Sequence, residues 1–438
     1  MRTRARVRAG ALAGALAILP CLALANGRFP ATNAIVVAPK DPGLVLLRST
    51  FGLLVSSDRG ASWDWVCEQS IGYGGVEDPP FAITGKPTIV GALFAGLALS
   101  QDRACNFALA TGPLDKQVFS DVVVSRTRPS EVLALSSSYD RRDDAGNNHY
   151  RSFVFASRDD GASFSLVGTA LDPSILFETI EISESDPSRV YLSGARDLVT
   201  GTVGVILVSK DAGLTFREYG VPLEKDERAP FIGAVDPDNP DRVYVRIAGS
   251  PDLARNRLLV SDDGAVTSRL VWSSSGPLAG LALSPDGKKV YAGSVKDGLV
   301  VAPRDTLAFE PRAKIQVQCL ATAGDRIYAC SNEQSGFIAG ASTDDGRTFA
   351  PLLRLSGLRG PLACPGGSRT TSECARLWPR LKIDLGVVDD AGADASPSPP
   401  VTVSASGGCS AVGGGGMVAG AGLSLLAVLA MLVRRRGG

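Results

Sequence analysis

The chain has very little of what metal and acid–base chemistry usually require. It contains one histidine, His149, and three methionines among 438 residues. A single histidine excludes a histidine-rich metal centre and argues against Ser-His-Asp or Cys-His catalysis. Net positive charge is also missing, because 45 basic residues balance 45 acidic ones. We therefore expect no cofactor, no metal and no nucleic-acid partner held by bulk charge.

The N-terminus has the order of charge and hydrophobicity of a targeting segment. Four arginines within the first eight residues precede a short apolar run and a small-x-small tripeptide that ends at Ala25. This order is typical of a secretory signal peptide, so we predict that residues 1–25 are removed by cleavage between Ala25 and Asn26. Cys21 raises the alternative of a lipoprotein signal, although Pro20 stands where such signals need a small residue.

The C-terminus has three parts. Residues 389–408 are rich in Asp, Ala, Ser, Pro and Gly and have almost no large apolar side chains, which predicts a disordered linker. Cys409 follows, and residues 411–433 are apolar and uncharged, which is long enough for a transmembrane helix. Three arginines at 434–436 should stay on the cytoplasmic side.

The cysteine, the apolar segment and the terminal arginines together resemble a MYXO-CTERM sorting tail of exported myxobacterial proteins, over residues 407–438. The resemblance implies that a sorting protease of the membrane cuts near Cys409 and that a lipid on this cysteine anchors the protein. A plain transmembrane anchor is the alternative. Either way we expect an exported protein, tethered through its C-terminus (409–438) to the outer membrane or cell surface. Without the arginines of its two ends, the body has 38 basic and 45 acidic residues.

One motif, S-x-D-x-G-x-[S/T]-[W/F], recurs along the body, and its aspartate positions are spaced 44, 57, 52, 52, 41 and 40 residues apart. The four intact copies contain Ser56, Asp58, Gly60 and Trp63; Ser157, Asp159, Gly161 and Phe164; Ser209, Asp211, Gly213 and Phe216; and Ser342, Asp344, Gly346 and Phe349. Two partial copies keep Ser100, Asp102 and Phe107, and Ser261, Asp263 and Thr267. At the seventh position, residues 302–309, only Phe309 remains.

Each copy is accompanied by signals for four short strands. Turn residues followed by a β-branched and an aromatic residue, as in Asp186-Pro187 before Val190-Tyr191, indicate a hairpin upstream of most copies. Four strands in 40–57 residues are typical of a propeller blade. We therefore predict an all-β, seven-bladed β-propeller over residues 26–388, with six or eight blades as alternatives. Residues 378–387 are predicted to form a late strand that closes the ring.

The repeat resembles the Asp-box, or BNR repeat, of sialidases, sortilin-type receptors, xyloglucanases and photosystem assembly factors, over about residues 33–355. The resemblance implies that these turns join the third and fourth strands of each blade on the outer rim. Ser and Asp side chains can bind turn N–H groups, and glycine permits a positive φ. We therefore predict a structural role for the motif residues, with a ligand or calcium role as the alternative.

Six cysteines remain between the two ends, and an even number in an exported protein favours disulfides. Nearness in sequence suggests Cys67–Cys105, Cys319–Cys330 and Cys364–Cys374. Fifteen connectivities are possible for six cysteines.

No catalytic residue is singled out. A sialidase needs three arginines that bind a carboxylate, a Tyr–Glu nucleophile pair and an Asp acid/base. Its first arginine usually lies in an Arg-Ile-Pro motif, to which Arg28-Phe29-Pro30 is only weakly similar. Other glycoside hydrolases need two carboxylates across the scissile bond, and no pair is marked by its neighbours. We expect a module that binds or scaffolds a protein or glycan. The alternative is a glycoside hydrolase of the sialidase or xyloglucanase type.

The most polar stretch, residues 136–150, is predicted to be a solvated hairpin tip, with calcium binding through Asp140, Asp143, Asp144 and Asn147 as the alternative. His149 belongs to this loop. Tyr73, within Gly72-Tyr73-Gly74-Gly75, is expected in a turn, with a pocket position as the alternative.

Overall fold

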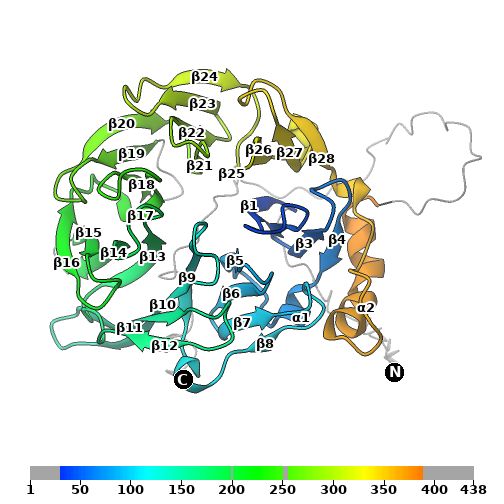
Figure 1. The fold of residues 1–438 in the computed structure, drawn as a ribbon, viewed down its shortest axis with the longest axis horizontal. Helices are drawn as coiled ribbons and strands as arrows, with labels where there is room; N and C mark the ends of the chain where they lie inside the picture. Colours follow the sequence, from blue (N-terminus) through cyan, green and yellow to red (C-terminus); the bar gives the residue numbers. More distant parts are fainter. Residues whose placement is uncertain (1–29, 199–200, 250–254, 388–438) are drawn as a thin grey trace, which may run out of the picture.

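A ring of seven antiparallel sheets, each with four strands, makes up the protein (Figure 1). The structure, a computed structural model, describes residues 30–198, 201–249 and 255–387. The prediction of seven blades is confirmed, and the alternatives of six and eight are excluded. The predicted signal peptide (1–25), linker (389–408) and tail (409–438) lie outside the described residues. In the ranges that the structure describes, no helix is long and apolar enough to cross a membrane.

Each blade is one continuous stretch of chain whose strands pair in sequence order. Blades 1 to 4 are β1 (Thr32–Val37), β2 (Val45–Ser49), β3 (Gly52–Ser56) and β4 (Asp64–Val66); β5 (Phe81–Ile83), β6 (Ile89–Leu93), β7 (Gly96–Ser100) and β8 (Ala108–Leu109); β9 (Phe119–Val124), β10 (Val132–Arg142), β11 (Asn148–Ser157) and β12 (Ser165–Val167); and β13 (Leu176–Ile182), β14 (Val190–Leu198), β15 (Gly201–Ser209) and β16 (Arg217–Val221). Blades 5 to 7 are β17 (Glu227–Val235), β18 (Val243–Gly249), β19 (Asn256–Ser261) and β20 (Arg269–Ser274); β21 (Leu278–Leu283), β22 (Lys289–Ser294), β23 (Gly298–Pro303) and β24 (Glu310–Ala313); and β25 (Cys319–Ala323), β26 (Arg326–Cys330), β27 (Ala339–Ser342) and β28 (Ala350–Leu353). The helices are α1 (Glu68–Ile71) and α2 (Arg369–Asp384), with 3-10 turns η1 (Gly112–Leu114), η2 (Glu333–Ser335) and η3 (Leu355–Gly357).

The core is divided into seven hydrophobic clusters, and each fills the space between two neighbouring blades. The first strand of each blade lies innermost and contacts the first strands of its neighbours, so the ring is continuous (Figure 1). Middle strands such as β3, with Leu53 and Leu54 fully buried, are apolar on both faces because a blade covers each side. Complete burial of one such leucine stabilises the fold by about 1.5–3 kcal/mol.

Six of the turns between third and fourth strands share one hydrogen-bond pattern. The serine that ends the third strand accepts the N–H four residues later at 2.8–2.9 Å. The aspartate two residues after the serine accepts the N–H four residues beyond itself at 2.9 Å. The Ser62 hydroxyl also donates to Asp58, and this bond is the main cause that lowers the pKa of Asp58 to about 2. The two partial copies, at Ser100 and Ser261, make the same bonds as the intact ones.

The aromatic residue that ends the motif packs between blades. Trp63, Phe164, Phe216 and Phe349 each belong to the cluster between their own blade and the preceding one. In blade 6, Ala302 stands where the other blades have serine, and the carbonyl of the next residue, Pro303, accepts the Leu307 N–H at 2.8 Å. A backbone hydrogen bond therefore holds this turn, so blade 6 can form it without the serine, aspartate and glycine of the motif.

The prediction of a closing strand over residues 378–387 was wrong, because most of this stretch belongs to α2. Ser368 caps the helix by accepting the Thr371 N–H, and α2 presents Cys374 and Trp378 to blade 1. Trp378 packs on Trp65 with ring centroids 5.8 Å apart. The helix is part of a C-terminal segment, residues 359–387, that runs along the outer edge of blade 1 and pairs there with Trp65 (Figure 1).

All six cysteines of the described residues form disulfides, but two of the three suggested pairings were wrong. Cys319–Cys330 is present, across the paired strands β25 and β26. The other two bonds are Cys67–Cys374 and Cys105–Cys364, which tie the C-terminal segment to blades 1 and 2. The other four cysteines do not pair with their neighbours in sequence, because the chain returns to its first two blades only after completing the ring.

Candidate functional site

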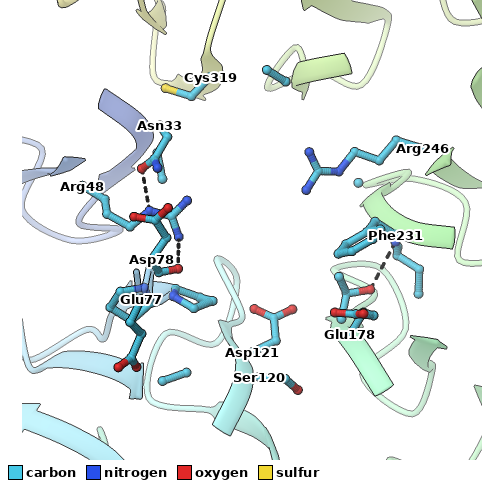
Figure 2. A pocket seen from close by; sticks show the side chains of 18 of the residues that line it. Asn33, Arg48, Glu77, Asp78, Ser120, Asp121, Glu178, Phe231, Arg246 and Cys319 are labelled. Atoms are coloured by element: carbon cyan, nitrogen blue, oxygen red, sulfur yellow. Dashed lines mark hydrogen bonds between the residues drawn. The ribbon is translucent and has the colours of Figure 1, made fainter. Parts of the chain in front are cut away.

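A cavity of about 390 Å³ lies at the centre of the ring. First strands of six blades contribute to its wall, and blade 2 contributes the loop of residues 76–80 that leads into β5. Figure 2 shows charged side chains from several blades that face this space. The site is therefore assembled from segments far apart in the sequence.

Arg246 of β18 extends its guanidinium into the cavity (Figure 2). The guanidinium lies 5.3 Å from the centroid of the Phe231 ring, and Nη1 donates a long hydrogen bond of 3.4 Å to the Leu278 carbonyl. Burial and the nearby charge of Arg48 lower the pKa of Arg246. Within the described ranges no carboxylate lies within ion-pair distance of it, and Asp121 acts on it only from farther away.

Asp121 of β9 and Glu178 of β13 are the acidic groups on the adjacent wall (Figure 2). Asp121 accepts the backbone N–H of Ile180 at 3.0 Å and that of Val122 at 2.9 Å. Burial nevertheless raises the pKa of Asp121 to about 7. Burial, together with the charge of Asp121, raises the pKa of Glu178 to about 7. Near neutral pH both groups are therefore partly protonated, and each can donate as well as accept a hydrogen bond.

A polar group on the opposite wall is held by its own contacts. Arg48 of β2 donates to the Asn33 side chain at 2.7 Å and to the Asp78 carbonyl at 2.8 Å (Figure 2). Glu77 accepts the Phe94 N–H at 2.7 Å, and burial raises its pKa to about 7. These interactions fix Arg48, so its guanidinium is less available to a ligand than that of Arg246.

The residues singled out in the sequence lie elsewhere. No residue of the repeated turns is in the cavity wall. Only residues 143–147 of the stretch 136–150 form the tip of the β10–β11 hairpin; the rest is paired in the two strands, and Ser136 and Ser137 are fully buried. His149 Nε2 lies 3.0 Å from a carboxylate oxygen of Asp143. Tyr73 follows α1 and is buried against Phe81, outside the cavity wall. Of the Arg28-Phe29-Pro30 tripeptide, only Pro30 is described.

The cavity residues were missed because no local motif marks them. The available signal was a charged residue inside a strand rich in apolar residues, as Asp121 in FSDVVV, Glu178 in LFETIEI and Arg246 in VYVRIAG. In the part of the chain that the structure describes, no group of three or more His, Cys, Asp or Glu side chains is arranged to hold a metal ion. The site therefore offers hydrogen bonds, carboxyl groups and two guanidinium groups, of which Arg48 is held by its own contacts.

The comparisons place the chain among propellers of low sequence identity. No protein-family model and no curated protein matches it. An ancestral GH74 enzyme is similar in structure, with a TM-score of 0.54 and 15% identity over 73% of this chain and 46% of that one. A Niastella koreensis GH74 enzyme (TM-score 0.32, 14% identity, 73% and 71% coverage) and the extracellular domain of a one-component system from B. thetaiotaomicron (0.43, 10%, 69% and 37%) are more distant. The chain thus spans about half the length of the ancestral GH74 enzyme, and at these identities the likeness shows the seven-bladed propeller fold alone.

Proposed function

We propose that the chain is an exported Asp-box propeller that binds a glycan in its central cavity while its C-terminal tail holds it at the cell surface. The observation that carries the binding proposal is the convergence of Arg246, Asp121 and Glu178 on one cavity of about 390 Å³. Enclosed spaces of this size with a few convergent polar groups suit small polar ligands. A protein partner needs a contact surface of about 800 Å² instead, so a glycan is the better occupant.

Hydrolysis is the second candidate, since four acidic residues, Asp121 and Glu178 among them, line the cavity and the fold is like that of an ancestral GH74 enzyme. Glycosidases need environments that push two carboxyl pKa values apart, so that one group is an acid while the other stays ionised. Here burial raises the pKa of Asp121 and of Glu178 to the same region, about 7. Binding is the first proposal because it requires only convergent polar groups, whereas hydrolysis also requires two carboxyl groups with divided roles.

The test is a glycan-array and calorimetric study of the purified full-length chain in a detergent without a sugar headgroup. Asp121→Asn and Glu178→Gln should each weaken binding about tenfold, because each replaces a carboxyl group, which can form a charge-assisted hydrogen bond, by a neutral amide. Glu310→Gln, on the exposed outer strand β24, is the matched control and should bind as the parent chain does. Turnover of xyloglucan or a fluorogenic sialoside would show that the hydrolase alternative is correct.

The sorting proposal rests on the sequence of the tail. Cys409→Ala should abolish proteolytic processing and lipid-dependent retention at the cell surface, measured by surface labelling and by the mass of the mature chain. A variant that is processed and retained as before would contradict the sorting-tail proposal and leave a plain membrane anchor.

A further inference from the structure

Arg246 carries a charge that no contact with a carboxylate neutralises in the described part of the chain. Its guanidinium contacts the Phe231 ring, with 5.3 Å to the ring centroid, and donates to the Leu278 carbonyl at 3.4 Å. Removing a charge from water is costly unless a partner compensates it, and the cavity leaves Arg246 partly desolvated. The second guanidinium, Arg48, faces the same cavity and increases this cost. A ligand that brings a negative charge to Arg246 would compensate this desolvation cost.

We infer that the cavity binds a sugar that carries a carboxylate, such as a uronic acid, and that the Arg246 guanidinium holds this carboxylate. The inference rests on the proposed function, since it names the ligand class of the same cavity. The planar fork of an arginine matches the two oxygens of a carboxylate in a bidentate pair. The guanidinium carbon lies over the Phe231 ring, 5.3 Å from its centroid, within the range of a cation–π interaction.

The acidic wall decides between classes of anion. Asp121 and Glu178 lie in the same cavity as Arg246, so a doubly charged phosphate would meet two carboxyl groups that repel it when ionised. A carboxylate brings one charge only. The hydroxyl groups of a sugar ring can donate to Asp121 and Glu178 in their ionised form, or accept from them in their protonated form. Glu77 and Asp78 also line the cavity, on the wall of Arg48. The arrangement of the Arg246 guanidinium opposite the carboxyl groups of Asp121 and Glu178 therefore favours a ligand with one carboxylate and several hydroxyls.

The experiment compares two matched pairs of sugars by calorimetry with the full-length chain at pH 6.5, in a detergent without a sugar headgroup. The pairs are D-galacturonate with D-galactose and D-glucuronate with D-glucose, which differ only at C6. We expect at least one acid to bind at least about tenfold more tightly than its neutral partner, as a charge-assisted bidentate pair implies. Arg246→Gln should remove this preference, and Arg246→Lys, which keeps the charge but loses the fork, should keep part of it.

Arg217→Gln is the matched control. Arg217 also lies 5.3 Å from the centroid of an aromatic ring, that of Tyr219, but on the exposed outer strand β16. The control should leave the preference for the acid unchanged. Circular dichroism and thermal unfolding of each variant establish that the fold is retained, and Arg246→Lys carries the test if Arg246→Gln does not fold.

The outcomes separate this inference from the proposed function. Equal binding of acid and neutral sugar, or binding of neutral glycans only, overturns the inference and leaves a glycan-binding propeller. A preference for the acid that survives in Arg246→Gln also overturns it. If neither these sugars nor any glycan of the array binds, both proposals fail.

Discussion

Replacing Cys67 and Cys374 by alanine releases the C-terminal segment from blade 1, and the structure allows its cost to be worked out. The chain-entropy model relates this cost to the loop that the disulfide closes. With Cys105–Cys364 intact, the loop runs from Cys67 to Cys105, crosses that disulfide, and returns from Cys364 to Cys374. It contains roughly 50 residues, so the expected loss is about 4 kcal/mol of unfolding free energy.

The two long-range disulfides should therefore act together. When both are absent, the first bond to be restored closes a stretch with a sequence separation of 259 or 307 residues. The loss for the quadruple variant is then about 10 kcal/mol, more than the sum of two single losses. Cys319→Ala with Cys330→Ala, whose separation is only 11, should cost about 3 kcal/mol.

Guanidinium unfolding, followed by tryptophan fluorescence and circular dichroism, measures these losses, since Trp65 and Trp378 report on the C-terminal segment. Peptide mapping under non-reducing conditions establishes the pairing independently. A loss below about 1 kcal/mol for Cys67→Ala with Cys374→Ala would refute the loop argument. A peptide that joins Cys67 to Cys105 would refute the connectivity itself.

Three further predictions concern the turns, the cavity and the blade spacing. Ser209→Ala removes the acceptor of the Gly213 N–H, a buried bond of 2.8 Å, and should cost about 1–2 kcal/mol in urea unfolding; an unchanged midpoint would contradict the role of this bond. The folded-state pKa of Asp121 is raised to about 7, so stability should fall as pH rises from about 4 to 7, and Asp121→Asn should make this fall smaller; an identical pH profile would refute the burial of this carboxyl. A Cβ at Gly194 would lie 2.3 Å from the Leu176 carbonyl oxygen, so Gly194→Ala should lower stability by about 1–3 kcal/mol, and an unshifted melting temperature would contradict this close approach.

Much of the propeller could be predicted because the information is local. Each blade carries its own turn, and the bonds of Ser56 and Asp58 span only four residues. The count of seven held even in blade 6, where Pro303 supports the turn through its backbone and the sequence motif is lost. Local hydrogen bonds repeat with the chain, so their spacing reveals the number of blades.

The way the ring closes could not be predicted in the same manner. Cys374 and Trp378 are four residues apart, a helical spacing, yet the sequence alone gave no reason for a helix at the edge of a propeller. The disulfide partners depend on where the chain returns after a full circuit, which no spacing encodes. The cavity poses the same difficulty, because Asp121, Glu178 and Arg246 meet only after three different blades have taken their places.

Because every blade comes from one stretch of chain, no sheet among residues 30–387, as far as the structure describes them, combines the first strands of the ring with the last. Gain or loss of a middle blade in a gene would leave every hydrogen-bonded sheet intact and would alter only the contacts between blades. Blades 1 and 2 are different, since each is covalently bound to the C-terminal segment. Evolutionary change in blade number is therefore expected among blades 3 to 7, where no long-range disulfide fixes a blade to the end of the chain.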